Sequence, residues 1–165
     1  MSRNSTPVQI RILTKPEVKF VEKPWGWERW IADGSPTFRY ALKEIFIKAP
    51  HKSSIQVHKD KQESNYIQRG RGILHYSLAP VDVDAYLDGR YRQDELDEML
   101  ATLSQQELLP GTVFHIFPGF IHRVEATEDL TMIEASSIEL DDVIRLKDDT
   151  GRGHGRIASE HRQKS

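Results

Sequence analysis

The stretch SIQVHKDKQESNYIQRG, residues 54–70, decides the fold. Gln56 and His58 are two residues apart in a strand-like run, so both side chains should point to the same face of a sheet. Glu63 follows a short charged turn at residues 59–62, and Gly70 closes the next β-rich run. The stretch therefore predicts two short strands that bring polar donors together.

A second stretch completes the set of donors. His122 follows a turn at Gly119 and begins another predicted strand. Strands so far apart in the chain meet only in the folded protein, where four nitrogen and oxygen donors could converge. These donors are Gln56, His58, Glu63 and His122. Such a set suits one divalent ion, with Zn, Mn, Fe, Co or Ni all acceptable, and leaves positions open for substrate oxygens.

The remainder of the chain is rich in short β patterns. Residues Tyr40–Ile47 alternate strictly, which places Lys43 on one face together with two isoleucines. Further β-rich runs, separated by glycine, proline or charged turns, lie at residues 54–58, 65–68, 72–78, 112–117, 122–126, 130–135 and 142–146. Many short strands at close spacing favour an all-β sandwich or barrel.

One segment has helical periodicity. Residues Gln93–Leu103 place apolar side chains at three-and-four spacing with acidic residues early in the run, which predicts one amphipathic α-helix. With the preceding aspartate-rich stretch it forms an expected insertion at about 80–106. We interpret this insertion as a lid or packing appendage without chemistry, because loop insertions are usually tolerated.

Length and composition limit the remaining possibilities. The 165 residues suit one domain, which we place at 19–152, with an N-terminal arm at 1–18 and a flexible tail at 153–165. A net charge of -2 argues against nucleic acid as a partner, and the lack of cysteine excludes disulfides and thiolate metal sites. No apolar run suggests a signal peptide or a membrane span, so we expect a soluble, cytoplasmic protein without a membrane partner.

The spacing of the metal donors resembles a known pair of motifs. Gln56-x-His58-x4-Glu63-x6-Gly70, followed by Gly111, Gly119 and His122, is similar to the two cupin motifs. The resemblance implies a cupin double-stranded β-helix, a jelly-roll barrel with the helix inserted between its motifs. Many cupins have histidine where Gln56 stands, but an amide oxygen can still serve as a ligand.

The flanking segments narrow this resemblance to the C-terminal domain of type II mannose-6-phosphate isomerases. The similar segments are VEKPWGWE at 21–28, SIQVH at 54–58 and DDVIRLKDDTGR at 141–152. In that family glutamine is the usual first ligand. A nucleotidyltransferase domain usually precedes the barrel in that family, and these 165 residues do not contain one, so we expect a stand-alone isomerase domain here. Three residues, Lys61, Asn65 and Thr150, depart from the family pattern.

The resemblance implies interconversion of mannose 6-phosphate and fructose 6-phosphate through an enediol, with the metal stabilising the oxyanion. Lys43 or Glu134 could be the base, Lys43 being ranked first, although a snorkelling lysine and a structural ion pair are equally simple explanations. Arg145 is a candidate for both catalysis and phosphate binding. Arg152 and Lys61 are further candidates for substrate binding.

Four other residues are less suited to the site, and two other functions compete with the isomerase. Arg123 should point away from its neighbour His122, and His51, His75 and His115 lack the spacing of metal ligands. The competing functions are a non-catalytic module that binds a sugar or nucleotide sugar, and a different metal-dependent cupin enzyme, an epimerase or an oxygenase. By analogy with cupins we expect a homodimer.

Overall fold

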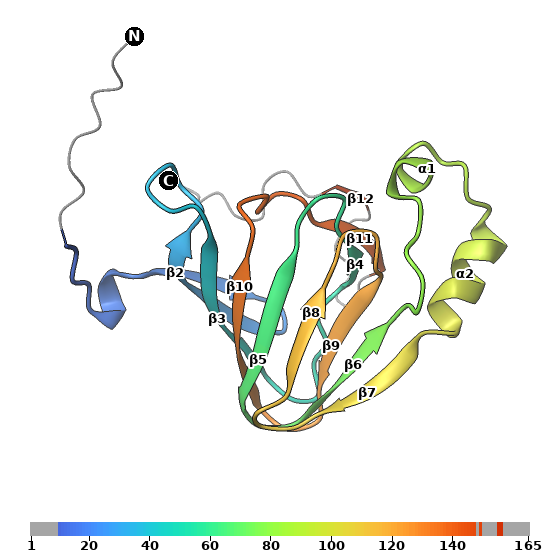
Figure 1. The fold of residues 1–165 in the computed structure, drawn as a ribbon. Helices are drawn as coiled ribbons and strands as arrows, with labels where there is room; N and C mark the ends of the chain where they lie inside the picture. The colour runs from blue at the N-terminus through green and yellow to red at the C-terminus, as the bar shows by residue number, and fades with distance from the viewer. Residues whose placement is uncertain (1–9, 148, 150–154, 157–165) are drawn as a thin grey trace, which may run out of the picture.

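The computed structural model describes residues 10–147, 149 and 155–156, which form two antiparallel sheets that face each other (Figure 1). The first sheet has the order β1 (Lys19–Lys23), β2 (Gly26–Asp33), β3 (Ala41–Ile47), β10 (Leu130–Ser136), β5 (Glu63–Arg69), β8 (Val113–Ile116). The second has the order β12 (Gly155–Arg156), β11 (Ile144–Lys147), β4 (Ile55–Val57), β9 (His122–Ala126), β6 (Gly72–Tyr76), β7 (Ser104–Leu108). This all-β arrangement is the predicted jelly-roll barrel.

Alternation along the strands explains which side chains point into the barrel. In β3 the residues Ala41, Lys43, Ile45 and Ile47 are buried and the residues between them are only partly buried, as the sequence predicts. The inward apolar side chains of both sheets form one core at the narrow end of the barrel: Trp25, Ile45, Ile47, Ile67, Leu74, Leu108, Val124, Ala126, Leu130 and Met132. Burying side chains of this size stabilises a fold by about 1.5–3 kcal/mol each.

The helices lie to one side of the barrel, between β6 and β7 (Figure 1). The predicted helix is α2 (Gln93–Ala101), and it is preceded by a short helix, α1 (Val83–Leu87), that the sequence analysis did not predict. Val83 of α1 packs with Ile55, Val57 and Ile144. The side chains of these three residues project from β4 and β11 on the side opposite the barrel interior. The end of the expected insertion was wrong, because residues 104–106 already belong to β7.

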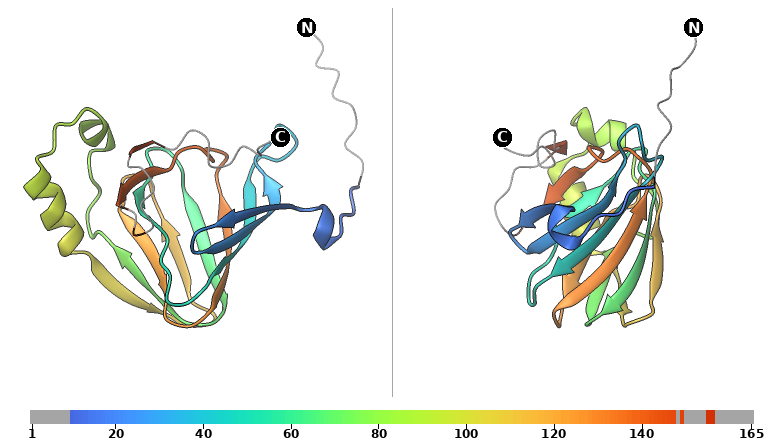
Figure 2. Two further views of the ribbon diagram at one scale, coloured as in Figure 1. Left: turned by 180° about the vertical axis from the view of Figure 1, so that it is seen from behind. Right: turned by 90° about the vertical axis from the view of Figure 1, so that its left-hand side faces the viewer.

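Two N-terminal strands were not predicted. β1 and β2 form a hairpin that crosses the barrel at an angle to the strands behind it (Figure 2), and β2 pairs with β3. Trp25 and Trp30 are buried, whereas Trp27 lies on the outer face between Phe20 and Phe46. Trp25 therefore belongs to the apolar core, whereas Trp27 packs on the outside of the hairpin.

The ends of the chain are described only in part. Residues 10–13 have no regular structure and are exposed, and a short 3-10 helix, η1, spans Lys15–Glu17. Most of the expected tail at 153–165 lies outside the described residues, and residues 155–156 form the edge strand β12. No helix in the described ranges is long and apolar enough to cross a membrane.

Gly70, which ends β5, provides a test of the barrel turns. Its φ is +77°, and an added Cβ would lie 2.0 Å from the backbone oxygen of Asp129. Gly89 has a similar φ of +69°, but an added Cβ would have no neighbour within 4 Å. We predict that Gly89→Ala lowers the free energy of unfolding by about 1–2 kcal/mol, from backbone strain alone, and Gly70→Ala by more than about 3 kcal/mol. Equal losses in chemical denaturation would show that the close approach at Gly70 is unimportant.

Candidate metal centre

A cavity opens between the two sheets, beyond the apolar core. Its lining includes core side chains such as Ile45, Ile47 and Met132. Among the described residues, its charged lining consists of three lysines and three glutamates, Lys23, Lys43, Lys61, Glu28, Glu63 and Glu134, and it also includes Gln56 and His122. A cavity whose lining combines apolar and charged side chains is typical of a binding site.

Three of the predicted metal donors meet at this cavity. The Glu63 carboxylate at the start of β5 lies between two imidazoles, with Oε2 3.6 Å from His58 Nε2 and Oε1 3.4 Å from His122 Nε2. All three residues are buried, and His58, just after β4, is 0 % exposed. In the described part of the chain, these residues form the group of histidine and acidic side chains that could hold a metal ion.

The hydrogen bonds of the two histidines prepare them as ligands. His58 Nδ1 donates to the backbone oxygen of Asp142 at 2.5 Å, and His122 Nδ1 donates to that of Phe120 at 3.0 Å. A carbonyl can only accept, so the proton of each neutral ring is on Nδ1 and the lone pair on Nε2 faces Glu63.

His58 gives the clearest evidence that the site fits a cation. Its Nε2 is buried and has no hydrogen-bond partner among the described residues. Burial lowers the pKa of His58, which keeps the imidazole neutral at physiological pH. A buried lone pair without a donor is costly, and a divalent ion is a group that would satisfy it.

Gln56, the fourth predicted donor, lies beside this group. Its Nε2 is 3.3 Å from His122 Nε2, and its Oε1 accepts from Ser54 Oγ at 3.4 Å. In this orientation the amide nitrogen, not the oxygen, faces the imidazole. The two ends of an amide have almost the same shape, so a half-turn of the side chain would present the oxygen that a metal ion requires.

Lys61 connects Glu63 to the second candidate base. Its Nζ is 2.6 Å from Glu63 Oε2 and 3.1 Å from Glu134 Oε1, and the lysine is 3 % exposed. Burial alone would lower the pKa of Lys61, but the two carboxylates outweigh it and raise the pKa. Burial alone would raise the pKa of Glu63, but the Lys61 cation holds it well below its usual value. Lys61 and Glu63 therefore stabilise each other's charged form.

Lys43 is also buried in the cavity. Its Nζ is 3.4 Å from Glu28 Oε2 and 4.1 Å from the centre of the Trp30 ring, so the predicted snorkelling alternative was wrong. Glu134 lies directly opposite Lys43 across the β3–β10 pairing. The two candidate bases thus come from neighbouring strands and line the same space.

The predicted arginines are placed differently. Arg145 on β11 is buried and pairs in register with Gln56, but it does not line the cavity, and Arg152 lies outside the described residues. Arg123 points away from the cavity, as predicted, and its guanidinium donates to the backbone oxygen of Ser53 and pairs with Asp149.

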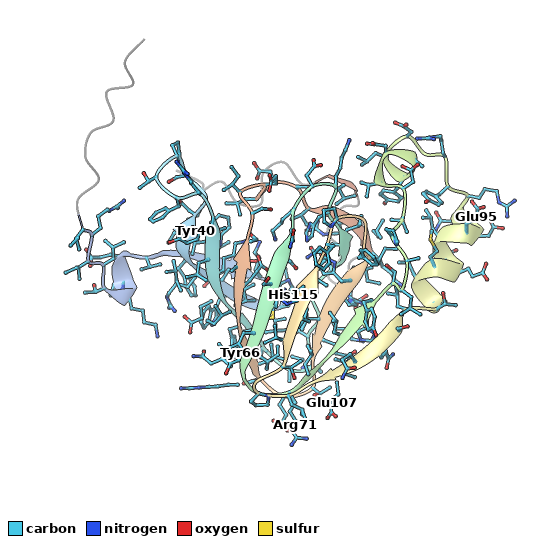
Figure 3. The ribbon with its side chains drawn as sticks, in the orientation of Figure 1. Tyr40, Tyr66, Arg71, Glu95, Glu107 and His115 are labelled. Atoms are coloured by element: carbon cyan, nitrogen blue, oxygen red, sulfur yellow. The ribbon has the colours of Figure 1, made fainter. Side chains whose placement is uncertain are left out.

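The histidines that were not assigned to the metal lie elsewhere. His75 pairs with Glu125 at 2.7 Å on the outer side of the second sheet. His115 bonds Ser64 on the outer face of the first sheet, where it appears with Tyr66 in Figure 3.

Three further buried polar residues lie near the site. Glu28 and Asp142 were not predicted as site residues, and Asn65 was named only as a departure from the family pattern. Glu28 accepts from Trp30 Nε1 at 2.9 Å, and Asp142 bonds the turn after His58. Asn65 is 1 % exposed, and neither atom of its amide has a partner among the described side chains and backbone. Glu28 and Asn65 lie at buried positions of strands, where a polar residue was the available signal, whereas Asp142 lies in a loop.

Comparison with known proteins gives the fold a name. No family model matches the chain, and no curated protein matches it. Among solved structures, a cupin-like protein from Thermotoga maritima superposes with a TM-score of 0.52 at 16% sequence identity over 81% of this chain and 79% of that one. The chain has the cupin fold.

Other solved structures share this cupin fold. An ectoine synthase from P. lautus gives a TM-score of 0.58 at 12% identity, covering 78% of each chain. The capsular polysaccharide assembling protein CapF from Staphylococcus aureus gives 0.57 at 14% identity over 88% of this chain. This chain spans only 33% of the length of that CapF. Identities this low establish the cupin fold and leave the activity to be argued from the site.

The assignment of the ligands predicts a simple loss of metal. His58→Ala and His122→Ala should each abolish stoichiometric divalent metal, because each removes one of two imidazole donors from the Glu63 group. Elemental analysis of the purified protein measures this, with circular dichroism as the check on folding. His75→Ala, which removes an outward histidine, should keep the metal. Full metal content in either site variant would refute the assignment.

Proposed function

We propose that this chain is a metal-dependent sugar-phosphate isomerase that interconverts mannose 6-phosphate and fructose 6-phosphate. One observation carries the proposal: a buried imidazole–carboxylate group shares its cavity with a second carboxylate, Glu134, and a buried lysine, Lys43. Proton transfer next to a carbonyl needs these parts, a centre that stabilises negative charge and a base beside it. The likeness of three sequence segments to the isomerase family supports the choice of substrate.

The metal would be held by Glu63, His58 and His122, with Gln56 as the fourth ligand after its amide turns. A divalent ion at such a site supplies Lewis acidity that stabilises the negative charge developing on a substrate oxygen. Metal binding at this cluster has support from the unsatisfied Nε2 of His58.

We assign the base to Glu134 in preference to Lys43. Glu134 lines the cavity and accepts a hydrogen bond from Lys61, and a carboxylate oxygen can take a proton. The Lys43 ammonium group is already engaged with other partners, because it lies against Glu28 and over the Trp30 ring. Glu134 would move the proton from C2 of the aldose to C1, while the hydroxyl proton passes from O2 to O1.

Substrate recognition would use the remaining polar groups. Asn65, opposite Glu134 on the neighbouring strand, has an amide that could bind a sugar hydroxyl. The phosphate needs cations, and Lys23 lines the cavity whereas Arg145 does not. We therefore propose Lys23, together with the predicted Arg152, as phosphate contacts, and assign Lys61 to the carboxylates that it already binds.

The proposal predicts metal-dependent turnover. Protein stripped of metal should not convert mannose 6-phosphate to fructose 6-phosphate, and resupply of a divalent ion should restore conversion. Glu134→Gln should lower kcat by at least about 100-fold without loss of bound metal, because it removes the base and keeps an oxygen for Lys61.

Glu44→Gln is the matched control for this variant. Glu44 follows Lys43 in β3 but points outward to Arg29, at 2.9 Å, so its loss should leave turnover unchanged. Absence of turnover with every divalent ion tested would contradict the isomerase. Binding of the sugar phosphate without turnover would favour a non-catalytic module, and oxygen consumption with iron would favour an oxygenase.

A further inference from the structure

We infer that Asp142 is a positioning residue for the metal centre, which holds both His58 and the turn that leads to Glu63. Asp142 lies between β10 and β11, far in sequence from the ligands, and it is 7 % exposed. The sequence pattern predicted a strand from Asp142, but the strand begins only at Ile144. The residue is therefore in a loop, and its hydrogen bonds explain why.

The carboxylate of Asp142 binds three consecutive backbone N–H groups. Oδ1 accepts from Lys59 at 3.0 Å, and Oδ2 accepts from Asp60 at 2.6 Å and from Lys61 at 2.8 Å. These residues form the turn between His58 and Glu63. Three donors converging on one carboxylate fix the path of the turn, and they set the direction in which Lys61 enters the cavity.

The backbone of Asp142 acts on the other ligand. Its carbonyl oxygen accepts from His58 Nδ1, and its own N–H donates to Glu139 at 3.1 Å, which holds the loop in a turn. Outer contacts of this kind determine the tautomer and orientation of a ligand histidine. Asp142 thus holds the His58 imidazole through its backbone oxygen, and it holds the turn that leads to Glu63 through its carboxylate.

Neighbouring contacts join the same two segments. Ser137 N–H donates to the backbone oxygen of Gln62 at 3.0 Å, and Gln62 N–H donates to Ser137 Oγ at 3.1 Å. The loop after β10 and the turn before β5 are therefore joined at a second point, next to Glu63. This inference rests on the proposed metal ligands, but not on the isomerase reaction.

Zinc affinity, measured by competition with a chromophoric chelator, tests the inference. Asp142→Ala should weaken zinc binding by about 10- to 100-fold, as removal of outer contacts does at other metal sites. Asp142→Asn, which keeps one acceptor oxygen, should fall between this variant and the unaltered chain. Asp129→Ala is the matched control, because Asp129 also accepts a backbone N–H, that of Ala49 at 3.0 Å, but at the opposite end of β10.

The outcomes separate positioning from stability alone. Unfolding midpoints should fall in both alanine variants, whereas zinc affinity should fall only at position 142. Unchanged affinity in Asp142→Ala or Asp142→Asn would overturn the inference. If Asp142→Ala does not fold, the zinc affinity of Asp142→Asn decides the question. A nitrogen-15 spectrum of the unaltered protein must also show His58 protonated on Nδ1. Failure of the unaltered protein to bind zinc or any other divalent ion would instead overturn the ligand assignment itself.

Discussion

The burial of one carboxylate, Glu63, is the constraint on which the rest of the site depends. Removing a charged carboxylate from water costs several kcal/mol unless partners replace the lost hydration. The protein supplies Lys61 at 2.6 Å from the carboxylate, whereas the two imidazoles beside it present lone pairs that a cation would satisfy. Lys61 in turn binds Glu134, so the lysine that compensates the burial of Glu63 also holds a second carboxylate in the cavity.

The jelly-roll topology makes this concentration of charge possible. Glu63 begins β5 in one sheet, His122 begins β9 in the other, and His58 follows β4, so the three donors meet where the sheets separate. The apolar side chains that stabilise the barrel come from both sheets, and several of them also line the cavity. The site therefore carries its buried charges beside the apolar core that stabilises the fold.

Local patterns were sufficient to predict much of this arrangement. Alternation in β3 correctly placed Lys43 on the buried face, and the spacing from Gln56 to Glu63 correctly brought these residues together with His122. Local patterns could not show the partners of Lys61, because the direction of a turn residue depends on Asp142, which is 81 positions away. The strand predicted from Asp142 was wrong at its start for the same reason, since the aspartate is fixed by three N–H groups of a distant turn.

The hairpin of β1 and β2 shows a different limit. Glu28 interrupts an aromatic segment, and its role became visible only when the pairing with β3 placed it beside Lys43. A charged residue on the buried face of a strand is therefore informative only when its cross-strand partner is known. The helices outside the barrel add apolar packing against β4 and β11, and their contribution to function stays a prediction.

The most direct test of a metal centre built around Glu63 is a crystal structure of the metal-loaded protein with anomalous diffraction data. The account predicts one strong anomalous peak at about 2.0–2.2 Å from His58 Nε2, His122 Nε2 and a Glu63 oxygen, with the Gln56 amide oxygen turned toward it. A metal-loaded crystal with no peak between these residues, and with Lys61 still bound to both carboxylates, would contradict the account.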